Sequence, residues 1–201
     1  MLLGKPNQRI NRDRALASGA LEQLGLTPGG YGLVTLHRPA NVDSPEALAP
    51  LVGALTKVAE ELPLILPAHP RAAAALRDLV ATDRIRLVPP AGYLDFVALQ
   101  VGARIVLTDS GGVQEETTAL GVPCVTLRDN TERPITVSEG TNILAGLDPA
   151  RIVEIAQRVL ADPPAARRPE LWDGHAGERI AEVLLSGGSA ATRLRPTDLA
   201  R

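Results

Sequence analysis

A glycine turn between a predicted strand and a predicted helix is the segment of this sequence best suited to chemistry. The apolar run Ile105–Leu107 leads into the turn 109–112 (DSGG), and a helix is expected to open on residues 113–116 (VQEE). The first N–H groups of a helix have no partner within it and lie at the positive end of its dipole. Glycines let a ligand approach the backbone closely. The pattern predicts an anion site for phosphate, although Gly-Gly before a helix is also found as a plain tight connection.

Charged residues near this turn have two interpretations each. Arg128, Glu132 and Arg133 follow the next predicted strand. An arginine there can grip phosphate oxygens through two hydrogen bonds, or it can be a solvated surface charge. Glu115 and Glu116 fall in the first turn of the predicted helix. The helix dipole favours carboxylates there in any case, but a carboxylate can also accept hydrogen bonds from ribose hydroxyls.

Two of the three histidines stand at the ends of predicted strands. His37, followed by Arg38, ends the first strand, and His69 ends the second. Ligands of open α/β sheets bind beyond the carboxyl ends of the strands. A single histidine is more often structural than functional, but placement at the same edge as the glycine turn favours a functional interpretation of both.

Short apolar strands alternate with helices along most of the chain. The strands are expected at residues 31–37, 64–68, 85–88, 105–108, 122–127 and 142–147. The helices are expected at 45–62, 70–82, 93–102, 112–120 and 149–160, with a helical stretch at 12–24 before them and a last helix at 178–185. Ser44 as N-cap and Pro45 in the first turn mark the start of the first long helix. Strands without polar alternation, each followed by a helix, indicate a doubly wound parallel sheet of six strands, an α/β fold.

Composition excludes several classes of protein. The chain has 201 residues, 45% of them hydrophobic, which is enough for a substantial core. A net charge of −2 and 2% aromatic residues argue against a nucleic-acid partner. No apolar stretch reaches the roughly 20 residues of a membrane helix. The lone Cys124 lies in an apolar run, which suits a buried thiol and a reducing cytoplasm.

Common cofactor and catalytic motifs are absent from the sequence. There is no cysteine pair or HExxH for a metal, and His37 and His69 lie on different predicted strands without a second ligand pair. No GxSxG, Walker or GxGxxG sequence is present. We therefore expect neither a metal nor another cofactor.

Five blocks in this order give the chain a resemblance to a known family. They are His37-Arg38, residues 67–70 (PAHP), 93–96 (YLDF), 108–116 (TDSGGVQEE) and 128–134 (RDNTERP). The sequence is similar over about residues 30–185 to the bacterial non-hydrolysing UDP-N-acetylglucosamine 2-epimerases. The DSGGxQEE and RDxTERP blocks are specific to that family and its hydrolysing relatives. The resemblance covers only the C-terminal half of the family's two-domain fold, which is like that of the B-type glycosyltransferases (GT-B), with two Rossmann-like halves around a cleft.

The resemblance implies a role for each matching residue. Ser110, Gly111 and Gly112 would contact the diphosphate of UDP, Glu116 the ribose, Phe96 the uracil and Arg133 the phosphates. His37 matches a histidine that contacts the diphosphate and is implicated in catalysis, and His69 matches a second histidine of the cleft. Ala91 stands where the family has a glutamine beside the uracil.

The family interconverts UDP-N-acetylglucosamine and UDP-N-acetylmannosamine for surface polysaccharides by eliminating and re-adding UDP. Its acid/base carboxylates lie in the N-terminal half, so we expect this chain to be a UDP-binding half that needs an N-terminal partner for turnover. A non-catalytic UDP-sugar binding module and the C-terminal domain of a GT-B glycosyltransferase remain alternatives. The family is usually dimeric, through contacts carried largely by the other half.

The sequence divides into four predicted segments. Residues 1–29 are a linker and helix remnant of the interdomain region, and residues 30–162 are the nucleotide-binding Rossmann-like domain. Residues 163–188 contain a closing C-terminal helix, and residues 189–201 are expected to be a disordered tail.

Overall fold

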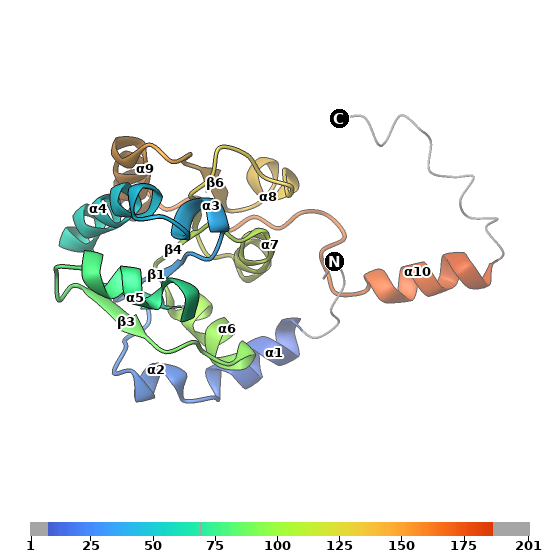
Figure 1. The fold of residues 1–201 in the computed structure, drawn as a ribbon. Helices are drawn as coiled ribbons and strands as arrows, with labels where there is room; N and C mark the ends of the chain where they lie inside the picture. Colours follow the sequence, from blue (N-terminus) through green and yellow to red (C-terminus); the bar gives the residue numbers. More distant parts are fainter. Residues whose placement is uncertain (1–7, 69, 187–201) are drawn as a thin grey trace. The chain divides into compact units, whose positions relative to one another are not determined.

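The computed structural model describes residues 8–68 and 70–186 and contains a six-stranded parallel sheet (Figure 1). The strands are β1 Gly32–Thr35, β2 Leu64–Pro67, β3 Ile85–Val88, β4 Ile105–Thr108, β5 Cys124–Thr126 and β6 Asn142–Leu144. Their order across the sheet is β3-β2-β1-β4-β5-β6. The predicted number of strands and their parallel pairing are confirmed, and the strand order is that of a Rossmann-like fold.

The strand order reverses between β1 and β4, which are neighbours in the sheet. β1 pairs in parallel with β4 from Gly32 opposite Ile105 to Thr35 opposite Thr108. The chain leaves β1 toward β2 on one side and later leaves β4 toward β5 on the other. The two connections diverge above this point and leave a crevice at the carboxyl edge, which is where ligands bind in such sheets.

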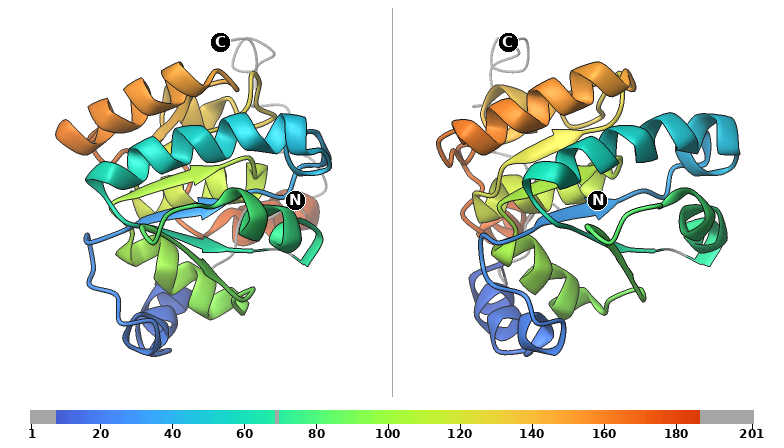
Figure 2. Two further views of the ribbon diagram at one scale, coloured as in Figure 1. Left: turned by 60° about the vertical axis from the view of Figure 1, so that its left-hand side comes forward. Right: turned by 90° about the vertical axis from the view of Figure 1, so that its left-hand side faces the viewer.

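Helices cover both faces of the sheet, as the two views of Figure 2 show. Helices α4 (Pro45–Glu61), α5 (Pro70–Leu79) and α9 (Pro149–Ala161) contribute to one core. Helices α2 (Ala20–Gln23), α6 (Tyr93–Gly102) and α7 (Gly111–Leu120) contribute to the other. Successive strand residues point to opposite faces, so Val34 and Leu107 belong to the first core and Leu33 and Val106 to the second. Burial on both faces explains why the strands lack polar alternation.

Helix α4 begins as the sequence predicts. Ser44 has extended backbone geometry, and its hydroxyl accepts a hydrogen bond from the Ala47 N–H at 3.2 Å. Pro45 follows at the first helical position, where its missing N–H costs nothing. The predicted Ser44 cap is therefore confirmed.

The single helical stretch predicted at 12–24 is wrong, because the structure has two helices there. Helix α1 spans Gln8–Leu16 and helix α2 spans Ala20–Gln23. Gly19 separates them with a φ of 75°, a left-handed conformation that glycine adopts readily and that ends a right-handed helix. Two four-residue helices, α3 (Pro39–Val42) and α8 (Ile135–Ser138), were not predicted, because such short elements have too few positions for a periodic pattern.

Residues Ile10–Pro169 form one compact unit, and the described residues before Ile10 and from Glu170 to Ser186 belong to a second one. Within the second unit, helix α10 (Ala176–Leu185) begins beside an ion pair in which Arg179 donates two hydrogen bonds to the Asp173 carboxylate, at 2.8 and 2.9 Å. Among the described residues, no helix is both long and apolar enough to span a membrane. The domain boundaries at 29/30 and 162/163 remain predictions, and the predicted tail 189–201 lies outside the described residues.

Candidate functional site

The carboxylate of Asp109 joins the ends of β1 and β4 at the crevice. Its side chain has no exposed surface. It accepts hydrogen bonds from the backbone N–H of His37 at 3.1 Å, from the backbone N–H of Arg38 at 2.9 Å and from Asn41 Nδ2 at 3.0 Å. The segment that follows β1 is therefore folded over a side chain that follows β4. Asp109 lies in the predicted turn, but no role was predicted for it, and the only signal in the sequence was an acidic residue directly after a buried strand.

The imidazole of His37 pairs with the same carboxylate. Its Nδ1 lies 2.9 Å from Asp109 Oδ1, while 49% of the His37 side chain remains exposed. The hydrogen bond to Asp109 raises the pKa of His37 above its usual value, against the opposing effects of partial burial and of Arg38. Burial acts to raise the pKa of Asp109, but hydrogen bonds from His37 and Arg38 outweigh it and hold that pKa below its usual value. Both shifts favour the charged pair.

The predicted turn joins β4 to the N-terminus of helix α7. Ser110 caps helix α7, with its hydroxyl accepting a hydrogen bond from the Val113 N–H at 3.5 Å. The Ser110 N–H donates to Thr108 Oγ1 at 3.0 Å, which fixes the turn to the end of β4. A Cβ added to Gly112 would meet only Ser110 Oγ, at 3.9 Å. The backbone of this turn is therefore open to a ligand at Gly112.

The block 128–134 lies against the same turn. Arg128 donates two hydrogen bonds of 2.8 Å to the carboxylate of Glu132, and this pairing lowers the pKa of Glu132 to about 2. Arg38 approaches the same carboxylate at 3.5 Å. A Cβ on Gly111 would lie 3.7 Å from Glu132 Oε2. Tertiary structure thus brings charged side chains from the segments after β1 and β5 to the glycine turn after β4.

The side chain of Arg133 lies beside the glycine turn and is 37% exposed. Its Cγ is 4.0 Å from the position that a Cβ on Gly111 would occupy. Its Nε lies 2.7 Å from Glu115 Oε1, an ion-pair contact whose angle falls outside hydrogen-bond geometry. Its Nη1 donates to the Glu132 carbonyl at 3.1 Å. Arg133 is within reach of an anion held at the turn, and Glu115 balances its charge here.

A buried polar network holds this block in place. The Gln114 side chain has no exposed surface, and its Oε1 accepts hydrogen bonds from Thr131 Oγ1 at 2.5 Å and from Asn142 Nδ2 at 3.4 Å. Asn142 also accepts a hydrogen bond from Thr126 at 2.6 Å and donates one to Thr136 at 3.1 Å. The network ties helix α7 to β5, β6 and the 128–134 block. The network is not predicted from the sequence. Gln114 and Thr131 lie in the blocks 108–116 and 128–134, but nothing in either block indicates that their side chains meet.

A cavity of about 220 Å³ opens at the crevice between the predicted residues. His37, Ser110 and Phe96 line it, together with Thr35, Leu36, Pro67, Pro90, Ala91 and Val113. The wall around Phe96 is mostly apolar, which suits a flat ring such as a nucleobase. His69 lies outside the described residues.

Glu116 is positioned by a buried partner on helix α6. Gln100 has no exposed surface, and its Nε2 donates a hydrogen bond of 2.7 Å to Glu116 Oε2. Glu116, Gly111, Gly112 and Arg133 are not among the residues that line the cavity. The structure therefore groups His37, Ser110 and Phe96 directly. It places Gly111, Gly112 and Glu116 on the adjoining helix α7, and Arg133 beside the turn in the block 128–134.

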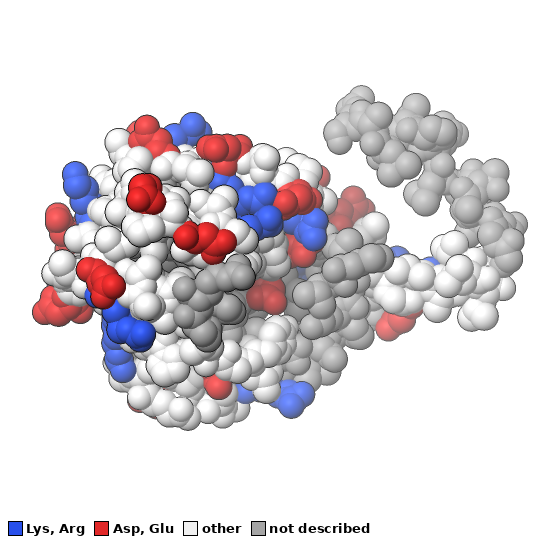
Figure 3. Space-filling view, in the orientation of Figure 1, with Lys and Arg blue, Asp and Glu red and all other residues white. Residues whose placement is uncertain are grey.

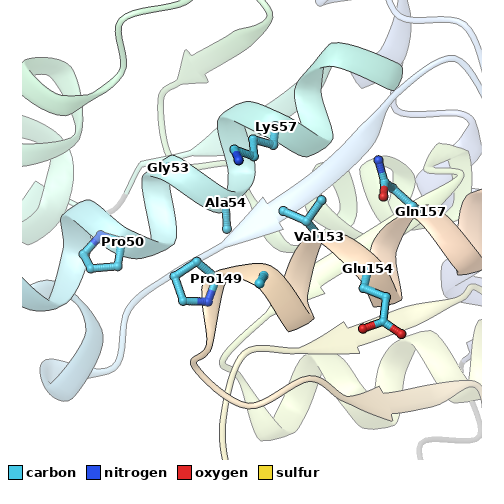
Figure 4. A pocket seen from close by; sticks show the side chains of 9 residues that line it. Pro50, Gly53, Ala54, Lys57, Pro149, Val153, Glu154 and Gln157 are labelled. Atoms are coloured by element: carbon cyan, nitrogen blue, oxygen red, sulfur yellow. The ribbon is translucent and has the colours of Figure 1, made fainter.

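A larger groove of about 600 Å³ lies between helices α4 and α9, away from the predicted residues. Pro50, Gly53, Ala54 and Lys57 line one wall, and Pro149, Ala150, Val153, Glu154 and Gln157 line the other. The charged ends of Lys57 and Glu154 do not converge on one point (Figure 4). Volume alone would select this groove, but the polar groups that could bind an anion converge at the crevice.

The face shown in Figure 3 carries charges of both signs. On the face shown in Figure 3, Lys and Arg side chains are interspersed with Asp and Glu side chains rather than gathered into one basic area. The positive groups near the glycine turn are instead paired with nearby carboxylates.

Comparison with known proteins identifies the family of this chain. A family model described as UDP-N-acetylglucosamine 2-epimerase matches residues 5–185. The chain belongs to that family. The match covers every described block of the crevice, so the resemblance noted in the sequence is confirmed.

This chain spans about half the length of the individual relatives that it matches. The UDP-N-acetylglucosamine 2-epimerase of Methanocaldococcus jannaschii is 40% identical over 165 residues, which are 78% of this chain and 45% of that protein. A UDP-2,3-diacetamido-2,3-dideoxy-D-glucuronate 2-epimerase of Pseudomonas aeruginosa is 38% identical over 179 residues, 87% of this chain and 51% of that protein. The solved structure of the M. jannaschii enzyme in complex with UDP-GlcNAc and UDP superposes with a TM-score of 0.79 at 34% identity, over 93% of this chain and 55% of that one.

Replacing Thr131 with valine tests the network behind the 128–134 block. The Gln114 Oε1 would keep only the 3.4 Å hydrogen bond from Asn142, and the Arg133 N–H would lose its 2.9 Å acceptor, Thr131 Oγ1. A buried polar group left without its partner costs about 1–3 kcal/mol, so the free energy of unfolding in urea should fall by about that amount. Thr131→Ser keeps the hydroxyl and should remain close to the parent chain. Equal stability of the valine and serine variants would contradict this role.

Proposed function

We propose that this chain is the UDP-binding half of a non-hydrolysing UDP-N-acetylglucosamine 2-epimerase, an isomerase. One observation carries the proposal. The open turn from Ser110 to Gly112 caps a helix at the point where the strand order reverses, with the His37 imidazole held beside it. This is an anion site at the position where Rossmann-like folds bind nucleotides.

The proposed roles follow the positions of the side chains around this turn. The Ser110 hydroxyl and the backbone N–H groups of Gly111 and Gly112 would receive the diphosphate, with His37 donating from the other side of the crevice and Arg133 approaching the phosphates. Phe96 would pack against uracil in the mostly apolar cavity. Glu116, oriented by Gln100, would accept hydrogen bonds from the ribose. His69 remains a proposed substrate contact from the family resemblance.

The reaction needs a stabilised leaving group. In the proposed elimination a base removes the C2 proton, the C1–O bond breaks, and its electron pair leaves on the β-phosphate oxygen of UDP. The product is 2-acetamidoglucal, and re-addition of UDP with protonation at the other face of C2 completes the inversion. The site at the crevice supplies the electrostatic term, because donors aimed at the diphosphate stabilise its developing charge. The family resemblance assigns the acid and base to carboxylates of an N-terminal half.

The names of the relatives agree on the nucleotide of the substrate and differ in its sugar. One relative is named for a diacetamido glucuronate and another for N-acetylglucosamine, and both names contain UDP. The residues discussed above are proposed to contact the UDP portion. We therefore propose UDP-N-acetylglucosamine as the substrate, because the more similar of these two relatives is named for it. We propose the cytoplasm as the location of the protein.

Calorimetric titration of UDP and of UDP-N-acetylglucosamine, followed by a C2 epimerisation assay on the same sample, tests the function. Binding of both without turnover is expected for a UDP-binding half. Turnover by the chain alone would contradict its dependence on a second half. Absence of binding to either nucleotide would overturn the proposal.

Replacing Gly112 with aspartate should abolish UDP binding while leaving the fold intact. The carboxylate would occupy the open side of the turn and repel the diphosphate, and the structure has room for it because an added Cβ meets only Ser110 Oγ. Gly53→Asp is the matched control, since it introduces the same side chain at a position with nothing within 4 Å, on helix α4. Calorimetry measures the UDP affinity of both variants, and circular dichroism checks that both are folded. Unchanged UDP affinity in Gly112→Asp would exclude the turn as the phosphate site.

Replacing Arg133 with alanine should weaken UDP more than uridine, because the lost contact is to phosphate. A hydrogen bond to a charged group is worth about 1.5–3 kcal/mol, so the Kd for UDP should rise by about tenfold or more. The Kd for uridine should stay nearly constant. Arg151→Ala on helix α9, an exposed arginine, controls for the change in net charge. Equal losses for UDP and uridine would remove Arg133 from this role.

A further inference from the structure

We propose that Asp109 is a positioning residue that holds His37 as an imidazolium, with Nδ1 bound to Asp109 and Nε2 presented to the crevice. The inference that the Nε2–H then donates to the diphosphate rests on the proposed function. Asp109 itself is fully buried and would touch neither the nucleotide nor the sugar. Its effect would be exerted entirely through His37.

The hydrogen bonds to the Asp109 side chain are those expected for an ionised carboxylate. A buried charge is costly unless donors surround it. Here two backbone N–H groups, from His37 and Arg38, and the Asn41 amide all donate to it. These neutral donors fix the position of both oxygens, and Oδ1 faces the His37 ring at 2.9 Å. The carboxylate is therefore preorganised before any ligand arrives.

This arrangement determines which ring nitrogen of His37 carries a proton. Since Asp109 can only accept, Nδ1 must be the donor. Nε2 is the ring nitrogen left for a ligand, on a side chain that is 49% exposed and lines the cavity. In a neutral ring Nε2 would be a lone pair, which repels a phosphate oxygen. In the charged ring Nε2 is an N–H donor. Only the imidazolium can therefore serve a diphosphate.

Few charged side chains surround His37 among the described residues. Asp109 favours the charged ring, and Arg38, the next residue, opposes it. Arg38 is itself near Glu132, at 3.5 Å, which offsets part of that opposition. The other described residues that line the cavity with His37, from β1, β2, α6 and α7, carry no titratable group. Asp109 is thus the group that sets the charge of the ring.

The raised pKa of His37 gives the sign of the pH dependence. Below that pKa the ring is charged and donates from Nε2, and above it the donor is lost. Affinity for a diphosphate ester should therefore be highest at low pH and should fall as pH rises through the His37 pKa. UDP-N-acetylglucosamine is the suitable probe, because its diphosphate is esterified at both ends and has no oxygen that titrates near neutral pH, whereas the terminal phosphate of UDP has a second pKa near 6.

The first measurement is an NMR titration of the wild-type chain, with His37→Gln used to assign the ring signals among three histidines. The expected result is a His37 pKa above the unperturbed value of about 6.5, with the proton of the neutral ring on Nδ1. A His37 pKa at or below about 6.5, or a neutral ring protonated on Nε2, would overturn the proposal. This test requires no ligand, so it separates failure of the pair from failure of the proposed function.

The second measurement compares Asp109→Asn with Asp83→Asn, a charge-matched change at an exposed position outside the site. Asp109→Asn should lower the His37 pKa and weaken UDP-N-acetylglucosamine at pH 7 by about tenfold or more. The loss should shrink as pH is lowered, and Asp83→Asn should show neither effect. A folded Asp109→Asn chain with an unchanged His37 pKa would overturn the positioning role. If that variant does not fold, the wild-type titration decides.

Binding of UDP-N-acetylglucosamine by the wild-type chain between about pH 6 and 8.5 closes the test. A Kd that rises as His37 loses its proton supports donation to the diphosphate. A Kd independent of pH, with a raised His37 pKa, would remove that donation and leave the proposed function standing. No binding at any pH, with a raised His37 pKa, would overturn the proposed function alone.

Discussion

The buried carboxylate of Asp109 is the interaction on which the crevice depends. It follows β4, yet its hydrogen-bond donors come from the segment that follows β1. In a parallel sheet these two strand ends are adjacent, but the chains leaving them diverge. Without a side chain to join them, the His37 segment would have no fixed position over the glycine turn. An ionised carboxylate suits this task, because its two oxygens accept several N–H groups at once.

A second buried set of hydrogen bonds holds the other side of the turn in place. Gln114 on helix α7 binds Thr131, and Asn142 on β6 joins the same network. The glycine turn is thus held between two polar anchors, one toward β1 and one toward β5 and β6. Helix α7 keeps its N-terminus open between them. Such preorganisation matters for anion binding, since the donors then need no rearrangement when charge arrives.

The chemistry that this arrangement supports is stabilisation of a departing diphosphate. The open N-terminus of a helix, a histidine held by a carboxylate and a nearby arginine all favour negative charge at one place. In the proposed function this half holds the nucleotide, and proton transfer at C2 belongs to the other half.

The sequence by itself determined the class of fold, the turn at 109–112 and the group of residues at the carboxyl edge. These features depend on local patterns, such as apolar strands, the Ser44 cap and a Ser-Gly-Gly turn before a helix, and on motif resemblance. It did not reveal the break at Gly19, whose left-handed φ leaves no periodic signature. Only the tertiary structure decided that Asp109 pairs with His37, 72 positions away, and that Gln114 meets Thr131 and Asn142. Such pairings follow from the strand order and from which buried polar groups find partners, and neither is encoded at short range.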